Sequence, residues 1–271
     1  MMFKTCQICG IEFKISPSRL FKRKTCSKEC QKALQDTRQD VICSICRRVQ
    51  RRPRCQLNRG KRSYCNGCRR KWNQKPIPEI FKNLTRKTVY LLGLLASDGH
   101  NKGSTGTIRF GSNDKELSEF VKDCLGERAR MRTERTQAGN PHYRVQLQSR
   151  LALDYLILLG IVPKKSKILR MPKFPPELFW DFFRGYFDGN GTAIRTRAIQ
   201  ICTGSINFAH DLVERLKSLG FTSQKIRKSK LVCAYYIVLN QKESQMIAKL
   251  MYDKDFPFAL ERKRRRLLGL Q

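Results

Sequence analysis

The sequence predicts an α+β protein whose main part is a duplicated half, preceded by two small cysteine-rich modules. Three observations carry this prediction. Nine of the 12 cysteines lie before residue 70, at repeated short spacings. Two apolar segments, 90–100 and 182–192, share a pattern of glycines. Each segment is followed by a similar series of strand-like and helix-like stretches, which indicates a tandem repeat.

Composition restricts the class of partner. With 271 residues and 40% hydrophobic content, the chain can bury a core, and we expect two or three compact units. The 56 Lys and Arg residues against 22 Asp and Glu give a formal charge of +34, which favours nucleic acid as the partner. No apolar run approaches the roughly 18 residues that a membrane span needs, and no lipidation motif is present, so we expect no membrane partner.

The first residues contain no apolar core of a signal peptide and soon reach a cysteine pair. We therefore expect an intracellular protein that is not secreted, working in a prokaryotic or phage cytoplasm or in an organelle. In such a reducing setting, cysteines are metal ligands rather than disulfides.

The cysteine spacing predicts two structural zinc sites, because paired thiolates two or three residues apart form a knuckle and two knuckles complete a tetrahedron. The first set is Cys6, Cys9, Cys26 and Cys30, and the second is Cys43, Cys46, Cys65 and Cys68. Cys55 is left over, as a substitute ligand or a plain thiol. We place the modules at residues 1–38 and 39–75. They are too short and too polar to fold by burial alone, so zinc supplies much of their folding free energy.

The modules are rich in Lys and Arg, with runs at 47–48, 51–52 and 69–71. Any one of these residues is explained by a solvated face, whereas the whole region is better explained by phosphate binding. Prolines at 76 and 78 follow in a polar stretch, which predicts a linker over residues 76–85.

Residues 88–97 are predicted to form a helix that is apolar almost all round and therefore buried. Gly93 in its middle indicates a close approach of two backbones, and Gly99 is expected to end the helix in a left-handed conformation. Asp98 stands out, because a carboxylate at the negative end of the helix dipole is disfavoured unless a cation lies beside it. This position therefore indicates a metal ligand.

The second apolar segment repeats the design. Gly185 aligns with Gly93, Gly191 with Gly99, and Asn190 takes the place of Asp98. After the first motif we expect a strand at Ile108 and Phe110, then a helix, two strands and a helix at 115–125, 128–135, 143–149 and 151–159. After the second motif we expect strands at 193–197 and 199–203, a helix at 208–219, strands at 224–228 and 231–239, and a helix at 243–251.

These paired helices, with their glycines and their Asp-Gly or Asn-Gly endings, resemble the LAGLIDADG homing endonucleases in the two-motif, single-chain form. The resemblance covers residues 86–271. It implies a pseudo-twofold tandem αββαββα core, with halves at 86–172 and 173–271, and antiparallel sheets lying on duplex DNA. It further implies that the second acid of each motif binds a divalent metal near a scissile phosphate.

Alternation along the strands supports a DNA-reading face. Arg128, Arg130 and Arg132 share one side of their strand, and Arg144, Gln146 and Gln148 share one side of the next, which suits recognition of guanine and adenine. A solvated polar face is the alternative. The full set of expected DNA-binding residues is Arg109, Arg128, Arg130, Arg132, Arg144, Gln146, Gln148, Arg195, Arg197 and Arg227.

Hydrolysis of a phosphodiester needs a metal and a nearby cation. With only 3 histidines, a histidine-metal nuclease finger is not expected. Asp98 is the expected ligand of Mg²⁺ or Mn²⁺, and Asn190 is expected at the matching metal position of the second motif. The resemblance implies a lysine near the scissile phosphate in each half, and the matching positions are Lys165 and Lys263.

Asn190 departs from the family pattern, because an amide offers a neutral oxygen in place of a charged one. Three outcomes are open: a nicking enzyme that uses Asp98 alone, a cutter of both strands in which Asp188 and Asn190 suffice, or a protein that binds without cleaving. An Asp-to-Asn change made to inactivate the enzyme would give the same sequence.

The leading hypothesis is a site-specific, metal-dependent DNA endonuclease of intron homing, a monomer that acts as a pseudo-dimer on a long duplex target. The alternative is a non-cleaving DNA-binding regulator or an RNA maturase derived from the same fold.

Overall fold

The computed structural model describes residues 2–19, 21–36, 38–43, 46–53, 77–253 and 258–270. The chain divides into two compact units, residues 1–73 and 74–271. None of the described helices is long and apolar enough to span a lipid bilayer.

The first unit is built from short elements and buries little apolar surface. Its elements are β1 (Met2–Thr5), β2 (Glu12–Ile15), η1 (Pro17–Arg19), α1 (Lys28–Gln35), β3 (Arg38–Ile42) and β4 (Val49–Pro53). β1 pairs with β2 and β3 with β4, both antiparallel. Among its described residues, only Cys6, Ile15 and Cys43 are buried hydrophobic side chains. Such a core is too small to hold the unit together, so another source of stability is needed.

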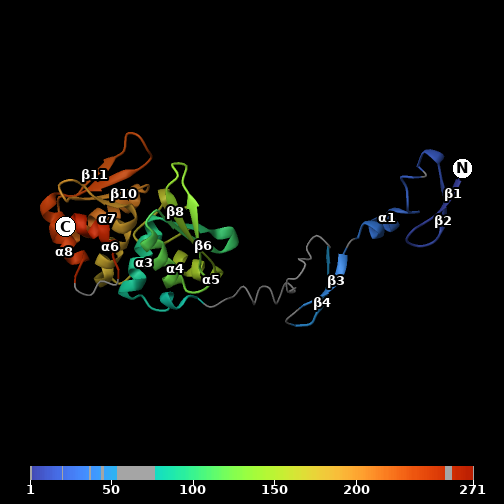
Figure 1. Ribbon diagram of the computed structural model, residues 1–271, viewed down its shortest axis with the longest axis horizontal. Helices are drawn as coiled ribbons and strands as arrows, with labels where there is room; N and C mark the ends of the chain where they lie inside the picture. Colours follow the sequence, from blue (N-terminus) through green and yellow to red (C-terminus); the bar gives the residue numbers. More distant parts are fainter. Residues whose placement is uncertain are drawn as a thin grey trace. The chain divides into compact units, whose positions relative to one another are not determined.

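The second unit repeats one series of elements twice (Figure 1). The first series is α3 (Arg86–Ser97), β5 (Gly99–Lys102), β6 (Thr107–Ser112), α4 (Lys115–Leu125), β7 (Arg130–Arg135), β8 (Pro141–Gln148) and α5 (Arg150–Leu158). The second is α6 (Phe179–Asn190), β9 (Gly191–Ala193), β10 (Ile199–Thr203), α7 (Ile206–Ser218), β11 (Lys225–Lys228), β12 (Tyr235–Val238) and α8 (Gln241–Met251). Short 3-10 turns η3 (Glu79–Phe81), η4 (Gly103–Thr105), η5 (Lys165–Lys167) and η6 (Pro176–Leu178) join them, and α9 (Glu261–Leu268) follows α8.

The two antiparallel sheets have the same strand order. In the first sheet the order is β5-β6-β8-β7, and in the second it is β9-β10-β12-β11, read from the corresponding edge. The predicted α+β class and the tandem αββαββα series are therefore confirmed. Both sheets lie on one side of the unit and most helices on the other (Figure 1).

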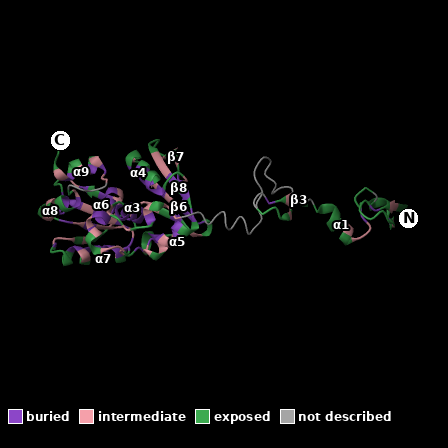
Figure 2. Ribbon diagram, turned by 90° about the horizontal axis from the view of Figure 1, so that it is seen from below, coloured by how far each residue is buried: buried purple, intermediate pink, exposed green. Residues whose placement is uncertain are grey.

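Helices α3 and α6 form the centre of the unit and are buried along most of their length (Figure 2). They touch at their glycines. A Cβ atom on Gly93 would lie 2.3 Å from the carbonyl oxygen of Phe182, and one on Gly185 would lie 2.1 Å from that of Tyr90. No side chain fits at either position, so the predicted close approach of two backbones is confirmed.

The expectation for Gly99 was wrong. Gly99 is absent from the glycines of positive φ and begins β5 directly after the helix. The reason for glycine is space, because a Cβ there would lie 2.2 Å from the carbonyl oxygen of Leu95. The same holds for Gly191, whose φ is −98°. Each motif helix therefore passes at once into a strand.

A buried charge cluster joins α6 to the rest of its half, and no sequence pattern indicated it. Arg184 is fully buried, pairs with Asp181 and donates to the carbonyl oxygens of Met251 at 2.5 Å and Phe258 at 3.0 Å. Arg86 of α3 also donates to Asp181, at 3.0 Å. Because a buried guanidinium is costly without such partners, the cluster fixes the position of α6.

Within the repeated series, most predicted elements agree with the observed ones to within two residues at each end, and three differ. β5 was not predicted, because Gly99–Lys102 carries no apolar alternation. The strand predicted at 193–197 lies instead at Gly191–Ala193, and the one predicted at 231–239 is confined to Tyr235–Val238.

The glycine contact predicts the stability of the second unit. We expect Gly185→Ala to lower the free energy of unfolding by about 1 to 3 kcal/mol, because the new methyl group must push α3 and α6 apart. The matched control is Gly103→Ala, whose Cβ would meet only Pro163 at 3.5 Å and should change stability by under about 1 kcal/mol. Urea unfolding of the full chain measures both, and equal midpoints for the two variants would contradict the account.

Candidate active site and nucleic-acid interface

Asp98 lies at the end of α3, against the end of α6. Its backbone N–H donates to the carbonyl oxygen of Leu94 at 3.0 Å, as the last bond of the helix. Its carboxylate oxygen Oδ2 lies 3.0 Å from the position that a Cβ on Gly189 would occupy. Gly189 directly precedes Asn190, so the ends of the two motifs adjoin. A Cβ on Gly189 would also lie 1.9 Å from Oγ of Ser97, so only glycine fits at this contact.

Two buried lysines close the ends of these helices in a matching way. Nζ of Lys165 donates to the carbonyl oxygens of Gly99 at 2.5 Å and Ser97 at 3.4 Å. Nζ of Lys263 donates to those of Asp188 at 2.6 Å, Phe187 at 3.0 Å and Gly189 at 3.3 Å. Each lysine binds the negative end of one helix dipole, where a cation is stabilising.

The pKa values in this cluster reflect burial opposed by charge. Burial raises the pKa of Asp98, while the ammonium groups of Lys263 and Lys165 act in the opposite direction. Burial lowers the pKa of Lys165 and of Lys263 to about 8, opposed by Asp98 and by Asp188 respectively. The lysines thus supply part of the cationic environment that the sequence required beside Asp98.

The two candidate metal-binding residues of the second motif, Asp188 and Asn190, differ in their surroundings. Asp188 is buried and accepts hydrogen bonds from the Tyr90 hydroxyl at 2.8 Å and the Leu260 N–H at 3.0 Å. Burial raises its pKa to about 6. Asp188 therefore holds the start of α9 against α6. Asn190 is the last residue of α6 and is only half-buried, so it is the residue that corresponds in place to Asp98.

The donor set suits a divalent cation better in one half than in the other. The helix-end carbonyl oxygens are engaged by the lysines, which leaves the Asp98 carboxylate and the Asn190 amide as oxygen donors. Mg²⁺ and Mn²⁺ prefer hard, charged oxygen ligands together with phosphate oxygens and water. The Asp98 carboxylate meets this requirement, and the neutral amide of Asn190 meets it weakly.

Two polar side chains near Asp98, those of His142 and Asp114, were not singled out from the sequence. Nδ1 of His142 lies 2.9 Å from Oδ1 of Asn113. The neighbouring Asp114 accepts two hydrogen bonds from Arg262 of α9, at 2.8 and 2.6 Å. They come from loops and a strand end, where sequence periodicity carries no signal.

The first sheet has one buried and one exposed face, as the alternation predicted. Val145 and Leu147 of β8 are buried, and Gln146 and Gln148 are exposed. Strand register brings Arg109, Gln146 and Arg130 into one row, and Gly111, Arg144 and Arg132 into the next. Arg109 donates to Gln146 at 3.1 Å and Arg144 to Glu134 at 2.9 Å, which orders these donors.

Several of the expected DNA-binding residues lie outside the strands. Arg128 precedes β7 and donates to the carbonyl oxygen of Gln148 at 3.2 Å. Arg195 and Arg197 were expected on a strand, but both lie in the turn between β9 and β10, where Arg197 has a φ of 56°. Arg227 is exposed on β11, opposite Tyr236.

The first cysteine set forms a cluster fit for zinc. The sulfur atoms of Cys6, Cys9, Cys26 and Cys30 all lie within 4.8 Å of one another. The distance from Cys9 to Cys26 is 3.4 Å and from Cys26 to Cys30 is 3.6 Å, close to the roughly 3.8 Å between sulfurs bound tetrahedrally at about 2.3 Å from zinc. Of the second set, Cys65 and Cys68 lie outside the described residues, as does Cys55.

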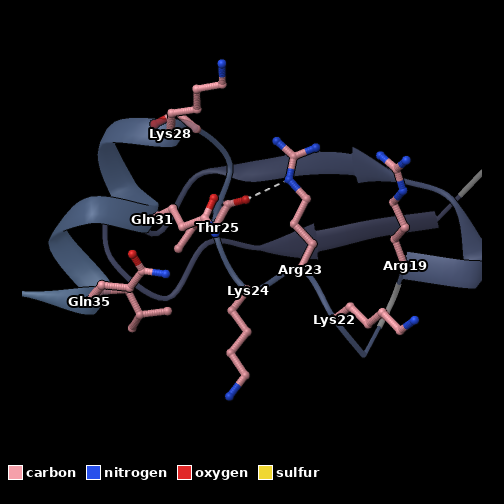
Figure 3. A pocket seen from close by; sticks show the side chains of 10 residues that line it. Arg19, Lys22, Arg23, Lys24, Thr25, Lys28, Gln31 and Gln35 are labelled. Carbon is pink, nitrogen blue, oxygen red and sulfur yellow. Dashed lines mark hydrogen bonds between the residues drawn. The ribbon is translucent and has the colours of Figure 1, made fainter.

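A basic cavity of about 590 Å³ lies next to this cluster, between the β2–α1 loop and α1 (Figure 3). Its lining includes Arg19, Lys22, Lys24 and Lys28, and no acidic side chain. Arg23 has a structural task, donating to the carbonyl oxygens of Thr25 and Cys26. The cavity gives the module a cationic surface suited to phosphate.

Comparison with known proteins agrees with this geometry. Residues 86–157 match the family model described as LAGLIDADG-like domain. The homing endonuclease I-WcaI, solved bound to its DNA recognition sequence, has a TM-score of 0.52 over 79% of this chain and 95% of its own, at 14% identity. That similarity shows the fold of the second unit.

Two curated relatives carry a related segment. One subunit of the A-type ATP synthase of Methanopyrus kandleri is 27% identical over 51% of this chain, and a DNA polymerase of Thermococcus hydrothermalis is 25% identical over 65%. The matches span only 13% and 10% of the length of those relatives.

The cysteine cluster predicts the metal dependence of the first unit. We expect a strong chelator to remove zinc and unfold the first unit, because its described core contains one aliphatic side chain. Amide hydrogen exchange should then become fast in residues 2–36, while the second unit keeps its protection. Added zinc should restore protection, and Cys26→Ser should behave like the chelated protein. Protection that survives chelation would contradict the prediction.

Proposed function

We propose that this chain, which contains a LAGLIDADG-like domain, is a site-specific DNA endonuclease of the homing type that hydrolyses phosphodiesters with Mg²⁺ or Mn²⁺. It works as a monomer whose two halves imitate a dimer on a long duplex target. The single observation that supports this most is the meeting of Asp98, Lys165 and Lys263 at the adjoining ends of α3 and α6.

Each member of this cluster has a separate task in hydrolysis. Asp98, helped by the amide oxygen of Asn190, would hold the divalent cation, which polarises the phosphate and lowers the pKa of bound water. The ammonium groups of Lys165 and Lys263 would stabilise negative charge developing on the phosphate oxygens. Their backbone partners fix both nitrogen atoms before the substrate arrives, which is the preorganisation that transition-state stabilisation requires.

The exposed faces of the two sheets are the proposed reading surface. Arginine donors on the first sheet suit guanine and glutamine amides suit adenine in the major groove. Arg128, Arg195, Arg197 and Arg227 lie at turns and on an outer strand, where contacts to the sugar-phosphate backbone are expected. I-WcaI, the structural neighbour bound to its DNA recognition sequence, supports a DNA-binding role for this fold.

Cleavage should be unequal between the strands. Asn190 supplies no charge to a cation, and Asp188 is engaged by Tyr90 and Leu260 in the interior. The half ending at Asp98 is therefore the more competent, and the proposed product is a nicked duplex. A non-cleaving regulator or RNA maturase is the alternative that the test below separates.

The difference between Asp98 and Asn190 leads to a direct prediction. Incubated with Mg²⁺ and a duplex selected from a randomised library by binding, the full chain should nick one strand. Asp98→Asn should abolish nicking without weakening binding, and Asn190→Asp should add cleavage of the second strand, slower than that of the first. Binding without any cut by the chain and by the Asn190→Asp variant would establish the non-cleaving alternative.

The first unit should extend the footprint on DNA by binding phosphates. Removing residues 1–75 should weaken binding and flatten its dependence on salt, by about 0.9 in the log-log slope for each phosphate that is no longer neutralised. The double variant Lys22→Gln and Lys28→Gln, at the basic cavity, should produce a smaller change and flatten the slope by the amount expected for about two phosphates. A slope that stays unchanged on deletion would assign the modules to another partner.

A further inference from the structure

We infer that His142, its ring held by Asn113, is the general base of the hydrolytic centre at Asp98. This inference rests on the proposed endonuclease activity and deepens it. It adds a catalytic residue that neither the motif helices nor the two lysines supply, and it gives one half of the molecule a proton acceptor that the other half lacks.

Strand register and packing bring His142 close to the end of α3 at Asp98. Gly99 lies opposite Phe110 in the antiparallel pair of β5 and β6, so Asp98 is opposed to Gly111 one step further along. Gly111 in turn lies opposite Arg144 of β8, and His142 follows two residues away on the same face. Arg144 completes the Gly111 row, and His142 lies diagonally beside Gly111, which itself is opposed to Asp98.

Gly111 makes room for the imidazole ring. A Cβ on Gly111 would lie 2.7 Å from Nε2 and 3.2 Å from Cε1 of His142. The ring thus lies over the glycine, in the gap between β8 and Asp98, where any other residue would displace it. The positive charge that His142 can carry also acts to lower the pKa of Asp98, which agrees with their proximity.

The bond to Asn113 selects the useful form of the ring. Since Oδ1 of Asn113 can only accept, Nδ1 of His142 must donate to it across their 2.9 Å. In the neutral ring Nε2 is then an acceptor, free to take a proton from water. Histidine is the side chain best matched to proton transfer near neutral pH, and a positioned base contributes about 10²- to 10⁴-fold.

The chemical step balances without a further reactant. Water attacks the phosphorus of the scissile phosphodiester, its oxygen forms the new P–O bond and one of its protons passes to Nε2 of His142. The P–O bond to the leaving deoxyribose oxygen breaks, and that oxygen takes a proton from solvent. The imidazolium later returns its proton to solvent.

The second half has no counterpart of His142 or Asn113. Gly191 lies opposite Ile201, so Asn190, one residue earlier, is placed opposite Cys202. Cys202 in turn lies opposite Tyr236 of β12. The position equivalent to His142 is therefore Ala234, and the one equivalent to Asn113 is Gly204. Neither residue has a side chain that binds a proton. Asn190 is therefore accompanied by neither the imidazole nor the amide that lie near Asp98.

The test uses the full chain and the duplex recovered from a randomised library, with single-turnover nicking measured at saturating protein. We expect His142→Ala to slow nicking by about 100-fold or more, with the affinity for the duplex and the melting temperature unchanged. Added imidazole should restore nicking several-fold. Ala234→Ser, the matched control in the second half, should leave the rate unchanged.

Two outcomes would overturn the inference: a His142→Ala rate within threefold of the parent, or a slow rate that imidazole leaves unchanged. His142→Gln, which keeps the polar contact but accepts no proton, should be as slow as His142→Ala, and it replaces that variant if the latter does not fold. If the parent itself does not nick, the proposed function fails, and that result is distinct from both.

Discussion

The backbone contact of α3 with α6 at Gly93 and Gly185 is the constraint on which the second unit depends. Side chains at either glycine would separate the helices, and their ends would no longer adjoin. Because each helix passes at once into a strand, the same contact also sets where the two sheets begin. The separation of the two sheets and the geometry of the cluster at Asp98 are therefore consequences of one packing interaction.

The two halves share a backbone but differ in chemistry. Each has a buried lysine that binds the carbonyl oxygens at the end of its motif helix. Around Asp98 the first half adds His142 and Asn113, whereas around Asn190 the second half has Ala234 and Gly204. In the proposed function, the symmetry of the fold serves binding to the duplex, while the groups proposed for hydrolysis lie mainly on one side.

The sequence predicted the features that follow from repetition and periodicity. The glycine pattern predicted the contact of α3 with α6, cysteine spacing predicted the cluster at Cys6, and alternation predicted the exposed face at Gln146 and Gln148. It failed where tertiary packing decides. Gly99 was expected to be left-handed, yet the close carbonyl oxygen of Leu95 is the reason for glycine there. Arg184 and His142 were missed, because a buried guanidinium and a loop-held imidazole depend on partners 67 and 29 residues away.

The central claim is that one chemically complete centre exists, at Asp98. Anomalous scattering from Mn²⁺ in crystals of the full chain bound to its selected duplex tests this most directly. The account predicts one strong manganese peak within bonding distance of the Asp98 carboxylate, with the His142 ring facing the scissile phosphate. Two equal peaks, one bound to Asp98 and the other to Asn190, or a peak remote from Asp98, would contradict it.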